Sequence, residues 1–429
     1  MTTLAEYAYD AQVAGLSWSW TNSVKGMVLT VAGHNDKLRV LLDKVVETVT
    51  AEQTYLDEKM LQRQLERYAR SLENFWKENP YQIAIYGASV ALNTPRWNYK
   101  EKSATLKAKK VTVRELADFV KLNIISSASK LVVMCIGNIT RLKAIEWSES
   151  VWSKFSFETS FSPVPPRVVA VPEGKTHFLR EQCDNVNSAL EFVCQLGSEI
   201  KHGNRLAALC RVLTSLSDEP CFNELRTVQQ LGYIVHLGLR KDGTGVWALR
   251  IVIQSGTHPL DDLVERTFRF LEGLGSILEG YSDESFREHV KSCVQNRLEA
   301  DLSLAEEARR WWDEIEQGVY KFDRDEVLAR EIASITRREV KDFFNTYIHP
   351  TSATMRRFFI SGIDARNGTP AGPSEHVSKN VAATKKKASL EQKLMEEKFG
   401  QLVCLGGGDL AAWRDSCELW PYIDRTSAL

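Results

Sequence analysis

The same series of predicted elements occurs twice along the chain, and this duplication constrains the fold more than any other feature. In the first copy, residues 15–20 and 26–33 predict two strands, which an amphipathic helix follows. In the second copy, residues 232–237 and 246–253 predict the same pair of strands, joined across an Asp-Gly turn and again followed by a helix. A unit repeated in the same order predicts two homologous domains.

The repeat continues beyond these strands. A later helix in each copy opens with Thr-x-x-Glu, at residues 112–115 and 336–339. In this capping box the Thr hydroxyl accepts from a backbone amide and the Glu side chain reaches back to the first residue. Each helix leads to an apolar segment, residues 130–137 and 357–362, which predicts a closing strand. One shared helix would be chance, whereas several features in one order indicate duplication.

Hairpins, long helices and a closing strand are typical of α+β proteins. We therefore expect two homologous domains, each a mainly antiparallel sheet covered by helices on one face. The predicted domains are residues 1–161 and 167–429, and the proline-rich residues 161–166 join them. Residues 364–388, rich in Pro, Gly, Ser and Lys, predict a flexible segment, and residues 389–399 predict a short helix.

The two copies differ at their beginnings. The second copy has strand-like residues at 167–170 and 176–179 before its first helices, whereas the first copy begins almost inside a helix at residues 4–9. A sheet without its edge strand would expose unpaired backbone groups. We therefore expect the first domain to lack its leading strand, and the chain to derive from a longer protein on its N-terminal side.

Composition excludes several classes of function. A net charge of -1 gives no basic bias toward nucleic acid or an anionic membrane. No apolar run reaches the length of a membrane span, and the N-terminus has no signal-peptide pattern. The eight cysteines contain no C-x-x-C pair, which indicates free thiols in a reducing compartment. We expect a cytoplasmic protein; the C-terminal Ala428-Leu429 is only a weak peroxisomal hint, because a basic residue is missing before the last Leu.

The sequence carries no complete catalytic motif. The inverted zinc motif H-x-x-E-H needs two His and a Glu on one helix face. The nearest strings, residues 285–289 and 372–376, each lack the first His, so His289 and His376 are not predicted ligands. Neither G-x-S-x-G nor a P-loop is present. We therefore predict no self-sufficient catalytic site and no metal site in this chain.

Arg226 and Tyr233 are the remaining candidate functional residues. They lie seven residues apart, and we expect Gly232 to end a helix so that Tyr233 starts a strand. Both side chains donate hydrogen bonds, and two donors that converge on a carbonyl oxygen would stabilise a developing oxyanion. The alternative interpretation is a solvated helix Arg and a half-buried strand Tyr, which most such residues are.

Residues 219–235, EPCFNELRTVQQLGYIV, resemble the substrate-clamping segment of the insulysin, nardilysin and pitrilysin group of inverzincin zinc metallopeptidases. Shorter phrases that resemble the same family occur in the same order over nearly the whole chain: Glu6-Tyr7-Ala8-Tyr9, Ala14-Gly15-Leu16-Ser17, Asn35-Asp36-Lys37, Gly137-Asn138-Ile139-Thr140, Ile253-Gln254-Ser255, Trp312-Asp313-Glu314-Ile315 and Phe322-Asp323-Arg324-Asp325.

The resemblance implies four homologous domains in two halves that close on a peptide chamber. This chain resembles the third and fourth domains, the C-terminal half. The zinc and its H-x-x-E-H ligands are implied in an N-terminal half, present in cis or in trans, with peptides as substrates. The residues that reach the peptide carbonyl fall on Arg226 and Tyr233.

Two functions from different classes fit these observations. The chain is either the non-zinc-binding half of an insulysin-like metalloendopeptidase, or a stand-alone, catalytically inactive peptide-binding or scaffold subunit. A truncated product is a third reading, and a homo-oligomer is left open. Neither nucleic acid nor a membrane is an expected partner.

Overall fold

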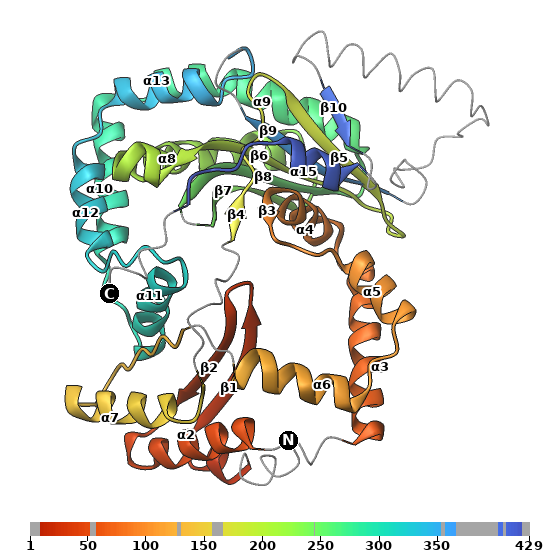
Figure 1. Cartoon of the computed structure of the whole chain (residues 1–429). Coiled ribbons are helices and arrows are strands. Elements are labelled where there is room, and N and C mark those ends of the chain that lie inside the picture. The colour runs from red at the N-terminus through yellow and green to blue at the C-terminus, as the bar shows by residue number, and fades with distance from the viewer. Residues whose placement is uncertain are drawn as a thin grey trace. The chain divides into compact units, whose positions relative to one another are not determined.

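The computed structural model describes residues 9–51, 57–126, 130–156, 166–243, 245–352, 357–365, 402–405 and 409–422. The chain forms two compact units (Figure 1). Unit 1 comprises Met1–Glu73, Trp97–Pro166 and Asp301–Trp312, and unit 2 comprises Asn74–Arg96, Arg167–Ala300 and Asp313–Leu429. The domain limits 1–161 and 167–429 stay a prediction. Most of the expected flexible segment 364–388, and the whole expected helix 389–399, lie outside the described residues.

Unit 2 is built on a six-stranded sheet in the order β10-β5-β9-β6-β8-β7. Strand β5 runs parallel to both β10 and β9, and the other neighbouring pairs are antiparallel. The fold is therefore α+β with a mainly antiparallel sheet, as predicted. The strands are β5 Thr176–Gln182, β6 Ser188–Ser198, β7 Ile234–Asp242, β8 Val246–Ser255, β9 Phe358–Asp364 and β10 Leu402–Leu405, and β3 Asn93–Thr94 pairs separately with β4 Arg167–Val168.

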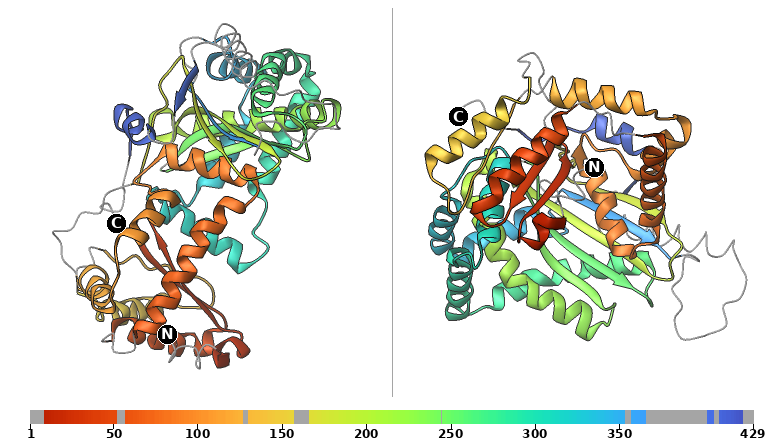
Figure 2. Two further views of the ribbon diagram at one scale, coloured as in Figure 1. Left: turned by 90° about the vertical axis from the view of Figure 1, so that its right-hand side faces the viewer. Right: turned by 90° about the horizontal axis from the view of Figure 1, so that it is seen from below.

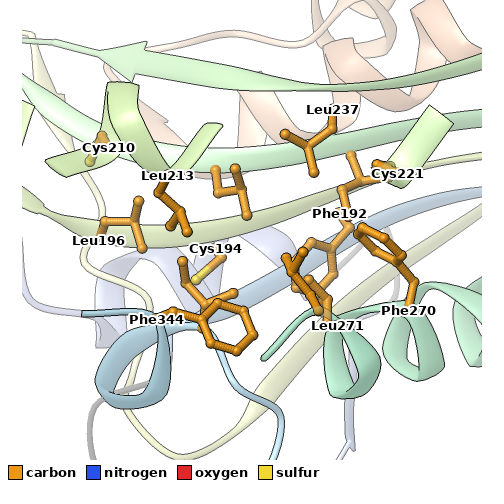
Figure 3. Close-up of a cluster of buried hydrophobic side chains, with 14 of the residues drawn as sticks. Phe192, Cys194, Leu196, Cys210, Leu213, Cys221, Leu237, Phe270, Leu271 and Phe344 are labelled. Carbon is orange, nitrogen blue, oxygen red and sulfur yellow. The ribbon is translucent and has the colours of Figure 1, made fainter. Parts of the chain in front are cut away.

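One face of this sheet packs against a layer of helices and forms the largest core. Phe192, Cys194 and Leu196 of β6 meet Leu213 of α8 and Phe344 of α13 there, as Figure 3 shows. The helices of unit 2 on this face of the sheet are α8 Glu199–Cys221, the π-helix η3 Phe222–Val228, α9 Leu260–Gly280, α10 Asp283–Leu298, α12 Arg324–Ala333 and α13 Arg337–Tyr347.

Helices also cover the second face of the sheet, which the sequence did not predict. Helix α4 Pro80–Leu92 lies against this face together with α15 Leu410–Ser416, and η1 Phe75–Lys77 precedes α4. A Cβ at Gly87 would lie 2.4 Å from the Ser361 hydroxyl of β9, so only glycine allows α4 to approach the sheet this closely. The small, buried side chains of Ala84 and Ala88 serve the same approach.

Unit 1 contains a two-stranded antiparallel sheet, β1 Ser17–Ser23 and β2 Gly26–Ala32, which confirms the first predicted hairpin. Leu16, Leu41 and Val45 form a small core where α2 packs near the hairpin. Figure 2 shows the two strands beside the helices of this unit. Those helices are α2 Asn35–Thr50, α3 Glu58–Asn74, α5 Tyr99–Ala108, α6 Val113–Val120, the π-helix η2 Lys121–Ile125 and α7 Arg141–Trp152, and α11 Leu304–Glu316 begins in unit 1 and ends in unit 2.

The predicted closing strand at residues 130–137 is wrong, whereas its counterpart at 357–362 is confirmed as β9. A strand forms only where a neighbour accepts its backbone hydrogen bonds. Strand β9 lies between β5 and β6. Within the described part of unit 1 the sheet contains β1 and β2 alone, and residues 130–137 form no ladder with either.

Both predicted capping boxes are confirmed. The backbone amide of Glu115 donates to the Thr112 hydroxyl at 3.2 Å, and that of Glu339 donates to the Thr336 hydroxyl at 3.3 Å. Each Glu carboxylate accepts from the backbone amide of its own Thr, at 3.0 and 2.9 Å. The reciprocal bonds satisfy donors that helix N-termini otherwise leave unpaired.

A buried ionic network holds the start of α8. The Arg324 guanidinium donates to the Glu199 carboxylate at 2.7 Å and also to Glu314. The Trp247 indole N–H donates to Glu199 at 2.7 Å. Burial opposes ionisation of Glu199, but the nearby cations Lys241 and Arg324 outweigh burial and lower its pKa. One arginine therefore bridges two carboxylates inside the protein, and Lys241 adds a second positive charge near Glu199.

Replacing Arg324 with Leu should destabilise unit 2 by about 3–5 kcal/mol, because two buried carboxylates lose their cation. The matched control is Arg338→Leu, because the Arg338 side chain is 90% exposed and pairs with Asp342; its loss should change stability by less than about 0.5 kcal/mol. Urea unfolding followed by circular dichroism compares the two. Equal midpoints for the two variants would contradict the structural role of the network.

Candidate functional site

The candidate site lies where α8 passes into the π-helix η3. Pro220, in the last turn of α8, has no N–H and cannot bond to the Leu216 carbonyl one turn earlier. The Tyr281 hydroxyl donates to that carbonyl at 2.8 Å and satisfies it. The proline therefore marks the end of the regular helix without leaving a buried acceptor unpaired. Such π-helical turns occur frequently at functional sites.

The chain then reverses into strand β7. Gln230 has a φ of 52°, in the left-handed region, and Leu231 is fully buried. Gly232 lies against the next strand, because a Cβ there would be 2.0 Å from the Gln254 carbonyl oxygen. The Gln254 side chain accepts from the backbone amide of Tyr81 at 3.1 Å, which ties this point to α4. The helix ends at Val228 and the strand begins at Ile234, so the expected helix end at Gly232 and strand start at Tyr233 are corrected.

This reversal brings Arg226 and Tyr233 together. The Arg226 guanidinium carbon lies 4.7 Å from the centroid of the Tyr233 ring and 4.7 Å from the centroid of the Phe222 ring. Tyr233 is 84% exposed and Phe222 is 44% exposed. Tyr233 is thus not the half-buried strand residue of the alternative interpretation, because it projects into solvent just before β7.

The polar atoms of these two side chains are available to a ligand. Within the described ranges, neither the Arg226 guanidinium nor the Tyr233 hydroxyl makes a hydrogen bond or ion pair with another residue. The nearby Glu224 carboxylate instead accepts from the Gln229 amide at 2.8 Å. The guanidinium presents five N–H donors in one plane and the phenol presents one. The site can therefore donate several hydrogen bonds to one carbonyl or carboxylate group.

Two residues of this site were missed from the sequence. Phe222 lies four residues before Arg226, a spacing that places both side chains on one face of a helix and could have indicated the contact. Gln254 is distant from Gly232 in the sequence, and the two residues come close only because β7, which follows Gly232, lies beside β8 in the sheet. No local pattern in the sequence indicates that approach.

The described residues do not fit a zinc ion. They bring together no group of three or more His, Cys, Asp or Glu side chains that could hold a metal. The Nδ1 atom of His289 lies 3.1 Å from the Ser215 hydroxyl oxygen, and His376 lies outside the described ranges. Among the helices described, none has the length and apolar character needed to cross a membrane.

Two family models match parts of the chain. Residues 1–105 match the model for the middle or third domain of peptidase M16. Residues 212–312, which contain Arg226 and Tyr233, match the model for lobe domain 4 at the C-terminus of PQQ synthase PqqF-like proteins. The first model describes a middle or third domain and the second a domain 4, and the two matches occur in that order along the chain.

Solved structures share the fold. The crystal structure of pitrilysin superposes with a TM-score of 0.80 at 19% identity, over 98% of this chain and 41% of that one. A structure titled peptidase M16 inactive domain from Pseudomonas fluorescens gives a TM-score of 0.61 at 14% identity, over 87% of this chain and 85% of that one. At these identities the likeness shows the fold alone, which is that of M16 peptidase domains.

Sequence relatives identify the branch of the family. Insulin-degrading enzymes from Bos taurus and Homo sapiens are each 32% identical to this chain over 351 residues. The peroxisomal insulin-degrading enzyme-like 1 of Arabidopsis thaliana is 29% identical over 377 residues. The first two matches cover 80% of this chain and 33% of each relative, so the chain spans about a third of their length. The chain is an insulysin-like member of the M16 peptidase family.

Replacing Gly232 with Ala should lower stability by about 1–3 kcal/mol, because the new methyl group collides with a backbone oxygen that cannot move independently. Gly273 in the interior of α9 is the control, since a Cβ there meets nothing within 4 Å; Gly273→Ala should stabilise by about 0.5–1 kcal/mol. Thermal unfolding of both variants checks the contrast. Shifts in the same direction would show that Gly232 is not a point of close approach.

Proposed function

We propose that this chain is the non-zinc-binding half of an insulysin-like metalloendopeptidase and holds the peptide substrate through Arg226 and Tyr233. The observation that supports this function is the pairing of two donors at one chain reversal, where Tyr233 is exposed and Arg226 is half-buried. They lie in the segment that resembles the family's substrate clamp, and the fourth-domain model covers that segment.

The chemistry of the two side chains suits a peptide carbonyl. The guanidinium is a fixed cation that cannot lose its proton in proteins, and the phenol adds a neutral donor beside it. Donors held in place before the reaction stabilise charge that develops on the carbonyl oxygen without reorganising. A site of this kind binds the peptide and supports its cleavage, but supplies neither the nucleophile nor the base.

The remaining parts come from a partner. An N-terminal half, in cis or in trans, would hold the zinc ion, because the described residues of this chain do not fit one. Unfolded peptides are the proposed substrates. The present chain, as the C-terminal half, would form a wall of the chamber that encloses them. We propose that the protein acts in the cytoplasm. The Arabidopsis relative is named peroxisomal, and that location is a property of the relative.

A stand-alone, inactive peptide-binding subunit is the second candidate. The structure titled as an inactive M16 domain corresponds to nearly the whole of this chain and is itself largely covered by it. Such a subunit would bind peptides through the same pair, Arg226 and Tyr233, without a partner and without zinc.

Reconstitution tests the first proposal. The chain is mixed with the N-terminal half of an insulysin-family peptidase, and cleavage of a fluorogenic peptide is measured. Arg226→Ala and Tyr233→Phe should each lower kcat by about 10²- to 10³-fold, the cost of removing one donor to an oxyanion. Arg226→Lys should have a kcat between those of the unsubstituted chain and Arg226→Ala, because it keeps the charge and loses the planar fork.

Arg269→Ala is the control, since Arg269 lies on the surface of α9 and pairs with Glu265 at 2.5 Å. If Arg226→Ala and Tyr233→Phe keep as high a kcat as Arg269→Ala, the two residues have no role in holding the substrate. Binding of a fluorescent peptide to the chain alone in the presence of a chelator, with no cleavage after the N-terminal half is added, favours the stand-alone subunit.

A further inference from the structure

We infer that Phe222 is a positioning residue, which holds the Arg226 guanidinium in the orientation that donates to a bound peptide. This inference rests on the proposed function of Arg226. Phe222 has no polar atom, so it cannot itself donate to a peptide carbonyl.

The arrangement of the three side chains is the first support. The guanidinium carbon of Arg226 lies at the same distance, 4.7 Å, from the Phe222 and Tyr233 ring centroids. A cation within about 6 Å of a ring face is attracted by the negative charge of that face. The two rings come from different elements, since Phe222 belongs to η3 and Tyr233 lies beside β7. Together they restrict a long side chain that would otherwise sample many rotamers.

The kind of contact is the second support. A carboxylate partner would engage the N–H groups of the guanidinium, which point outward in its plane. An aromatic ring instead stacks on the flat face and leaves those N–H groups to other acceptors. In the described part of the chain no acceptor takes a hydrogen bond from Arg226. Stacking is therefore a way to fix this cation without occupying its donors.

The surroundings of Arg226 keep competing acceptors engaged. The Glu224 carboxylate accepts from the side-chain amide nitrogen of Gln229 at 2.8 Å. The side-chain amide oxygen of Gln229 accepts from the Arg266 guanidinium at 3.0 Å. Arg266 in turn donates to Asp262 at 2.9 Å. These polar groups thus pair with each other, whereas the Arg226 guanidinium lies against the Phe222 and Tyr233 rings.

Phe222→Leu is the test variant, because it keeps an apolar side chain and removes the ring. Phe222→Tyr and Phe222→Trp restore a ring face and should rescue the effect. Phe322→Leu is the matched control, since Phe322 is exposed to the same 44%. The first readout uses this chain alone: the ¹⁵N order parameter of the Arg226 Nε–Hε group, assigned by comparison with Arg226→Lys. We expect Phe222→Leu to lower the order parameter and Phe222→Tyr to restore it.

The second readout uses the reconstituted enzyme. Phe222→Leu should lower kcat by about two- to fivefold with little change in KM, the factor equivalent to one exposed cation–π contact. Unchanged order of Arg226 in Phe222→Leu overturns the inference, even if KM changes, because Phe222 would then contact the peptide directly. Loss of order that the ring variants restore supports it. Should Arg226→Ala leave cleavage intact while Phe222→Leu loosens Arg226, the proposed function fails and the positioning contact stands.

Discussion

Strand β6 is buried at all eleven of its positions, and the placement of the other elements of unit 2 follows from that burial. Alternate side chains of a strand point to opposite faces of a sheet, so both faces must be covered. Phe192 and Cys194 meet the α8, α9 and α13 layer. On the other face Glu191 is fully buried and accepts from Arg240 at 3.0 Å, and Arg240 also donates to Ser89 of α4. A carboxylate at that position requires a cation, and the same cation holds the covering helix.

The position of the candidate site depends on α8, which starts where β6 ends. Arg324 holds the first residue of α8, Glu199, in a network that excludes water. Near the other end, Tyr281 donates to the Leu216 carbonyl that Pro220 leaves without a partner. Both ends of the helix are thus fixed to neighbouring elements by polar contacts. Arg226, in the segment that follows, is therefore held by a fixed support although its side chain is only half-buried.

Local patterns in the sequence predicted the parts of the fold that local interactions decide. The Thr112 and Thr336 capping boxes use atoms three residues apart, and both form. Residues 130–137 have strong strand character, yet strand formation depends on a neighbour that the described part of unit 1 does not offer. The second helical layer was missed because Gly87 matters only through its approach to β9. Arg226 and Tyr233 came from the family resemblance, and their direct contact depends on the turn at Gln230.

The proposed site has a physical reason to need a second surface. Within the described ranges its donors are paired with no residue. Tyr233 is exposed and Arg226 is half-buried, so water satisfies these donors in the free protein at little cost. A hydrogen bond gains strength only when water is excluded and the local dielectric falls. Arg226 and Tyr233 project from one reversal that leaves Tyr233 84% exposed, and so they cannot exclude water by themselves. A surface that closes over a bound peptide would desolvate the donors, the rings and the peptide carbonyl together. On the proposed function, the partner half therefore supplies the enclosure as well as the metal, and the stacked rings keep the guanidinium in position until that closure occurs.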